Sequence, residues 1–138
     1  ADRIEPVEEF LRHGVSLEER LVEVAVLVVA KHWRAQYVWT SHGPAAEKAG
    51  VAPAIVEAIR MGDTPVFKLD DEAVCYRFCT DMIAGREADD TLWAEAQAVF
   101  GETGVTELLG LLGLYTSVCL TMVGYRMPTK NGEPEPLP

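Results

Sequence analysis

Residues 21–50 read LVEVAVLVVAKHWRAQYVWTSHGPAAEKAG, and this stretch decides the fold. Its first ten residues are apolar except for Glu23. A helix that is apolar on every side has to be surrounded by other parts of a protein. We expect a long helix over Leu17–Trp33 and a second over Gln36–Ala49, with Gly50 at the C-terminal cap of the second helix. The two helices would form an antiparallel hairpin.

Outward from this hairpin, helix signals recur along the chain and strand signals are nearly absent. Ser16 and Glu19 fit a capping box at the start of the first long helix. Pro44 removes a backbone donor, which predicts a kink or a break near His42. We expect further helices over Glu5–His13, Pro53–Met61, Asp70–Ala84 and Thr91–Phe100 (capped by Asp90), and a last long helix from Thr103 or Gly104.

Together these signals predict an all-α fold: one domain of about six helices over residues 1–127, followed by a proline-rich tail over residues 128–138. A chain of 138 residues suits one domain with its own core. The tail has no apolar periodicity and should be an extended arm or disordered.

The formal net charge of the chain is -10. Because such an acidic surface repels phosphate backbones and anionic lipids, we expect neither a nucleic acid nor a membrane as a partner. The three cysteines are Cys75, Cys79 and Cys119, and none forms a C-x-x-C motif. We therefore expect no disulfide framework, and we expect a cytoplasmic location. Cys75 and Cys79 share a helical face and fit buried apolar positions better than a redox pair.

A second apolar segment, Val105–Tyr125, is long enough to span a membrane, with Glu107 as its only charge. Its glycines, serine and threonines favour a buried helix instead. A small domain can surround one all-apolar helix but hardly two. We therefore expect a homo-oligomer in which another subunit buries one face of at least one of them.

Glu23 stands alone among apolar residues, and an unpaired buried carboxylate costs several kcal/mol, so Glu23 needs a partner. His42 follows it by nineteen residues, with the expected turn about midway between them. The spacing therefore predicts that the carboxylate lies beside the imidazole, as either an acid–base pair or a merely structural polar contact. Tyr37 and Trp39 are candidates to wall a pocket. Arg34 is a candidate partner for a substrate carboxylate, with an exposed surface ion pair as the alternative.

No metal site is expected. A metal site would have to join Glu23, His32 and His42, and their spacing fits no familiar ligand motif. His32 fits a cation at the C-terminal end of the first long helix.

At this point the sequence resembles a known family. Glu23–Ala30 followed by Ala35–Val51 is similar to the core of carboxymuconolactone decarboxylase-like proteins, a superfamily that includes the AhpD-type alkylhydroperoxidases. The family pattern has a Glu on one helix, a C-x-x-C motif opening the next, and a His nineteen residues after the Glu. Here Glu23 and His42 have that separation, but the cysteine positions hold Ala35 and Val38. Without a dithiol, thiol peroxidase activity is not expected.

The resemblance implies an AhpD-like helical subunit assembled as a trimer or hexamer. It also implies a cofactor-independent decarboxylase (lyase), or a related acid–base enzyme, that acts on a small lactone or organic acid of aromatic catabolism. His42, oriented by Glu23, would protonate the carbanion left by loss of CO2, and Tyr37 would help to hold the substrate. No metal or organic cofactor is required. The alternative is a non-catalytic member that binds a small molecule or serves in assembly.

Overall fold

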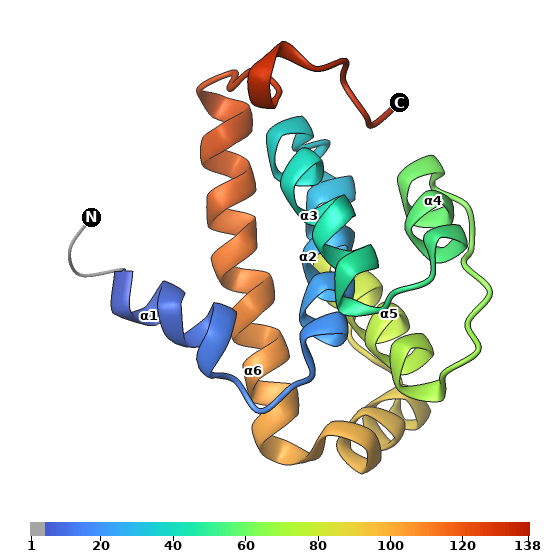
Figure 1. Ribbon diagram of the computed structural model, residues 1–138. Helices are drawn as coiled ribbons and strands as arrows, with labels where there is room; N and C mark the ends of the chain where they lie inside the picture. The colour runs from blue at the N-terminus through green and yellow to red at the C-terminus, as the bar shows by residue number, and fades with distance from the viewer. Residues whose placement is uncertain (1–4) are drawn as a thin grey trace.

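The computed structural model describes residues 5–138, and every regular element in that range is helical (Figure 1). The expected all-α single domain of about six helices is confirmed. The elements are α1 (Glu5–Glu9), the π-helical turn η1 (Phe10–Gly14), α2 (Glu19–Trp33), α3 (Gln36–Ala49), α4 (Pro53–Met61), α5 (Asp70–Ile83), α6 (Asp90–Gly124) and the 3-10 turn η2 (Lys130–Gly132).

Helix α2 is the centre of the core. Every residue of Leu21–Ala30 is buried, and α3, α5 and α6 pack around the helix. Packing within a single chain therefore explains why this stretch is apolar, because neighbouring helices cover all its sides. No second subunit is needed to bury α2.

Helices α2 and α3 are joined by two residues, Arg34 and Ala35, so they run antiparallel. The Ala35 N–H donates to the carbonyl of Ala30 at 2.9 Å, which closes the C-terminal end of α2. The second helix has the predicted bounds and ends at Gly50, whose φ of 108° belongs to the left-handed region.

Of the kink or break predicted near His42, the break was wrong, because α3 continues through Pro44 from Gln36 to Ala49. The residue before a proline normally avoids helical angles, since its Cβ meets the proline ring. Gly43 has no Cβ, which removes that clash and lets the helix continue. An added Cβ at Gly43 would also lie 3.2 Å from the indole nitrogen of Trp39.

Helix α6 bends at Gly101, where φ is 68° and ψ is 176°, a conformation reserved for glycine. The two parts on either side correspond to the two helices that the sequence predicts. The N-terminal cap is Asp89 rather than the expected Asp90. The Asp89 carboxylate accepts a hydrogen bond from the Leu92 N–H at 2.8 Å.

The expected capping box at Ser16 was also wrong. Helix α2 begins at Glu19, and its N-cap residue, Glu18, makes no side-chain cap. The backbone N–H and the hydroxyl of Ser16 instead donate to the Glu107 carboxylate, at 3.0 Å and 2.7 Å. Glu107 is only 8% exposed. A buried carboxylate has to be hydrogen-bonded, and this need takes Ser16 away from the helix start.

The C-terminal tail is an ordered, extended arm that crosses the upper ends of α6 and α3 (Figure 1). The side-chain amide of Gln36 donates to the Leu137 carbonyl at 2.9 Å and accepts from the Leu137 N–H at 2.8 Å. Arg60 donates to the carbonyl of Pro136 at 2.6 Å. The Leu137 side chain is buried. Of the two expectations for the tail, the extended arm holds and disorder does not.

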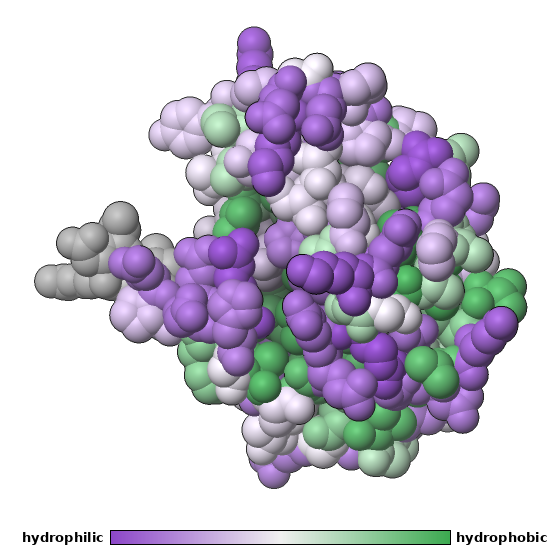
Figure 2. Space-filling model, in the orientation of Figure 1, coloured by the Kyte–Doolittle hydropathy of each residue, from purple (hydrophilic) through white to green (hydrophobic). Residues whose placement is uncertain are grey.

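Within residues 5–138, α6 is the only helix long and apolar enough to cross a membrane. One such helix is weak evidence, since the core helix of a soluble protein passes the same test. Only 28% of its most apolar stretch is buried within the chain. Leu109, Leu120 and Val123 are more than two-fifths exposed. Figure 2 shows apolar patches on the lower part of one face of the molecule, among strongly hydrophilic side chains.

We predict that Glu107→Ala lowers the free energy of unfolding by about 1–3 kcal/mol, because Ser16 loses its acceptor at the junction of α2 and α6. Denaturant titration measures this loss. Glu102→Ala, at an exposed position of the same helix, is the control and should be nearly neutral. Equal effects of the two substitutions would contradict a structural role for the buried carboxylate.

Candidate functional site

The predicted contact between Glu23 and His42 is confirmed. Nδ1 of His42 lies 2.8 Å from Oε2 of Glu23, and the two side chains are 15% and 11% exposed. The contact exists because α2 and α3 are antiparallel across a two-residue turn, which sets the two residues at the same level of the hairpin. The carboxylate thereby gains the partner that its burial requires.

This contact orients the imidazole. An ionised carboxylate only accepts hydrogen bonds, so Nδ1 of His42 carries the proton that Glu23 binds. Nε2 is then the nitrogen that can accept a proton or, when protonated, deliver one. Nε2 points toward the hydroxyl of Tyr115, at 3.5 Å. The two rings meet edge to face, with 5.2 Å between centroids and an interplanar angle of 87°.

Tyr115 is in turn held by Arg12 from the N-terminal segment. Nε of Arg12 donates to the Tyr115 hydroxyl at 2.9 Å, and the guanidinium carbon lies 5.8 Å from the centre of the tyrosine ring. Arg12 also pairs with Glu8 at 3.1 Å. The result is a continuous polar chain of carboxylate, imidazole, phenol and guanidinium that joins α2, α3, α6 and η1.

Burial raises the pKa of Tyr115 above its ordinary value, although the hydrogen bond from Arg12 opposes this. Burial alone would lower the pKa of Arg12, but the hydrogen bond with Tyr115 and the charge of Glu8 raise it overall. At neutral pH the chain therefore holds a neutral phenol beside a guanidinium cation. The phenol can accept from Arg12 and donate to Nε2 of His42 at the same time.

Sequence reasoning missed Tyr115 and Arg12. Tyr115 is the only aromatic residue of the second half of α6, and its buried hydroxyl needs a partner. That signal could have marked Tyr115 as part of a polar contact. Arg12 lies 103 residues before Tyr115, and nothing in its local sequence indicates this pairing.

The other three predicted site residues do not join this chain. Trp39 is buried in the core, only 4% exposed. Arg34 and Tyr37 line a separate cavity of about 220 Å³, between the start of α3, the end of α6 and the tail. That cavity lies between one and two helical turns from His42 along α3. Their predicted role in substrate binding stays a prediction.

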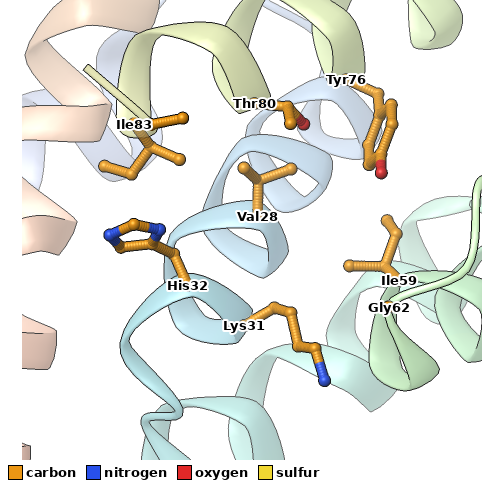
Figure 3. A pocket seen from close by; sticks show the side chains of 9 residues that line it. Val28, Lys31, His32, Ile59, Gly62, Tyr76, Thr80 and Ile83 are labelled. Atoms are coloured by element: carbon orange, nitrogen blue, oxygen red, sulfur yellow. The ribbon is translucent and has the colours of Figure 1, made fainter. Parts of the chain in front are cut away.

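Neither Glu23 nor His42 lines any of five well-defined cavities on residues 5–138. The most apolar is a cavity of about 180 Å³ between α2, α4 and α5, shown in Figure 3. His32 lies at its edge, and the buried hydroxyl of Thr80 in its wall has no hydrogen-bond partner. The structure thus separates His32 from the Glu23–His42 pair.

No group of three His, Cys, Asp or Glu side chains in the described part of the chain is placed to hold a metal ion. Cys75, Cys79 and Cys119 are all buried and free, as the sequence predicts for apolar positions. A hydrogen bond with Cys79, together with burial, raises the pKa of Cys75. Burial raises the pKa of Cys119 to about 12. Both thiols are therefore protonated and weakly nucleophilic at neutral pH.

Comparison with models of known protein families finds no match, and comparison with curated proteins finds none either.

We predict that Tyr115 makes the protein less stable in alkali. Its raised pKa means that the folded state keeps the phenol proton after the unfolded state has lost it near pH 10. This contribution is therefore complete below pH 10 and is lost as pH rises through the folded-state pKa. Denaturant titrations between pH 8 and about pH 12 should show a steeper fall for the wild type than for Tyr115→Phe.

Tyr125→Phe is the matched control, because the Tyr125 side chain is 81% exposed. It should follow the wild-type pH curve. If Tyr115→Phe also followed that curve, the buried phenol would not be coupled to folding in this way.

Proposed function

We propose that the protein is a cofactor-independent decarboxylase, or a related acid–base enzyme, that acts on a small lactone or organic acid. One observation carries the proposal: a buried carboxylate fixes one nitrogen of a partly buried imidazole, while the other nitrogen faces a phenol held by an arginine. Such an arrangement suits proton delivery, because the ring has a set tautomer and orientation before a substrate binds.

In the proposed reaction, the bond between the substrate and its carboxylate breaks, and CO2 leaves without the bonding electrons. Those electrons remain on the substrate as a carbanion delocalised into the neighbouring unsaturated system. Nε2 of protonated His42 gives its proton to that carbon, and the ring is reprotonated from solvent. Glu23 holds the ring in place through Nδ1, and Arg12 supplies positive charge where the carbanion develops.

Access to the imidazole follows from the N-terminal segment. Helix α1 and turn η1 contain no fully buried residue. The contacts that hold them against α6 include Arg12 on Tyr115, and Leu11 packed so closely on Gly110 that an added Cβ would lie 3.0 Å away. A segment with so little buried surface can open at small cost. We propose that it lifts to admit the substrate, whose carboxylate then takes the place of Glu8 on Arg12.

The resemblance to carboxymuconolactone decarboxylase-like proteins supports the same proposal, through the separation of Glu23 and His42 and the following helix. Ala35 and Val38 at the cysteine positions argue against a thiol peroxidase. The net charge of -10 argues against nucleic-acid and anionic-membrane partners. Three free buried thiols suit a cytoplasmic protein.

A non-catalytic small-molecule-binding or assembly protein is the second candidate. The observation that favours it is that Glu23 and His42 do not line any of the five cavities described above. In that case the pair would only satisfy a buried carboxylate.

The two candidates predict different results with lactone acids. We expect the wild type to release CO2 from carboxymuconolactone or a close relative, and His42→Gln to lower kcat by about 10²- to 10⁴-fold, because the proton donor is lost. Glu23→Gln should also lower kcat, since it frees the orientation of the ring.

His32→Gln is the matched control, because His32 lies on the cavity of Figure 3, away from the pair. It should keep full activity. If no lactone acid in a broad panel is turned over, or if His42→Gln is as active as the wild type, the enzyme proposal fails and the second candidate stands.

We also propose that α6 is the subunit interface of a homo-oligomer. The residues Leu109, Gly113, Thr116, Leu120 and Val123 follow one another at separations of four, three, four and three. This is the spacing of a seam between packed helices. Four of the five are exposed and Thr116 is half-buried. Gly113 has no atom within 4 Å of an added Cβ, which leaves room for a close helix.

Light scattering after size exclusion tests the assembly. We expect a trimer or hexamer for the wild type and a smaller species for Leu120→Glu, because a charge in the seam would be buried unpaired. Ala98→Glu adds the same charge at an exposed position before the bend and should leave the mass unchanged. A monomeric wild type would contradict the interface.

A further inference from the structure

Arg34 and Arg126 differ from the other arginines in the described part of the chain, because neither makes an ion pair within residues 5–138. The remaining five pair with carboxylates, in the contacts Arg12–Glu8, Arg20–Asp71, Arg60–Glu57, Arg77–Glu95 and Arg86–Asp81. In a protein with 22 acidic residues and 12 basic ones, two arginines without a carboxylate partner are unexpected.

Both arginines line the same cavity, which has a volume of about 220 Å³. Arg34 follows the C-terminal end of α2, and Arg126 follows that of α6. Their φ angles are 50° and 52°, in the left-handed region that favours glycine. A residue with a Cβ is held there at a cost of about 1–2 kcal/mol. The backbone therefore accepts strain at the two arginine positions that line this cavity.

The rest of the lining is largely apolar. It includes Met122, Val123, Met127 and Pro128, with Tyr37 from α3. Methionine side chains adapt to the shape of an apolar ligand, and the tyrosine ring offers a flat surface. A hydrated inorganic ion would gain nothing from these walls. An anion with an apolar body would be held at both ends.

Glu135 of the tail also lines the cavity, without an ion pair to either arginine. Its negative charge repels a second charge on a ligand, so a singly charged anion fits better than a multiply charged one. The size of the cavity suits a ligand of about one ring, because a cavity of about 150 Å³ is enough for benzene.

We propose that this cavity binds a small organic monocarboxylate of about one ring, with its carboxylate on Arg34 and Arg126 and its apolar body on the methionines. A guanidinium pair matches the two oxygens of a carboxylate. The net charge of -10 would repel anions elsewhere on the surface, so binding depends on this pair. The site is separate from the Glu23–His42 pair and does not rest on the proposed catalytic role of His42.

Benzoate is the probe, followed by two-dimensional NMR of the ¹⁵N-labelled full chain. We expect saturable shifts at the amides of Arg34, Gln36 and Arg126, with a Kd of about a millimolar for so small a ligand. Arg34→Asn and Arg126→Asn remove the charge but keep a residue that tolerates the left-handed region. Each should weaken binding by about 5-fold or more, because a charged hydrogen bond is lost.

Three controls complete the test. Arg86→Asn removes an exposed arginine at another site and should keep the wild-type affinity. Benzyl alcohol, which has the ring without the charge, should bind at least about 5-fold more weakly than benzoate. His42→Gln should bind benzoate as the wild type does, whether or not it loses activity.

Other results would overturn the proposal. They are the absence of saturable shifts, an unchanged affinity in both arginine variants, or displacement of benzoate by an equal concentration of inorganic phosphate. Loss of benzoate binding in folded His42→Gln would refute the separation of the two sites.

Discussion

A carboxylate inside the most deeply buried helix of the described chain is the constraint on which the rest of the structure depends. Helix α2 is surrounded by α3, α5 and α6, and Glu23 lies in its buried stretch. A buried carboxylate without a donor is costly, so α3 has to present His42 at this level of the hairpin. Tyr115 meets the other nitrogen of the imidazole, and Arg12 meets Tyr115. The polar chain thereby links α2, α3, α6 and η1.

The sequence could predict the parts of this arrangement that are local. Short connections and glycine caps fix α3 and α4 to within a residue, and a two-residue turn makes the levels of Glu23 and His42 a matter of counting. Contacts between distant segments were not predictable. Ser16 looks like a helix cap in its local sequence, but Glu107, 91 residues later, takes both of its donors. A tertiary demand overrode a local preference there.

Isolated polar residues in apolar helices carried more information than any local motif. Three such residues interrupt apolar runs: Glu23, Glu107 and Tyr115. Glu23 is hydrogen-bonded to the next helix, and the other two are hydrogen-bonded to segments far away in the sequence. Physical reasoning on the sequence can state that such a group requires a partner. It identifies the partner only where chain connectivity limits the choice, as it does for Glu23 but not for Tyr115.

The N-terminal segment and the C-terminal tail contact two different polar sites. The N-terminal segment joins the polar chain through the contact of Arg12 with Tyr115, and the C-terminal tail forms one wall of the cavity of Arg34 and Arg126. The N-terminal segment packs on α6 through η1, whereas the tail packs on α3 through η2. Helix α1 and turn η1 contain no fully buried residue, whereas the tail is fixed by Leu137 and the Gln36 amide. The N-terminal segment is therefore easier to detach than the tail. The proposed acid–base site, which has to admit a substrate, therefore suits the N-terminal side, and the proposed anion site suits the C-terminal side.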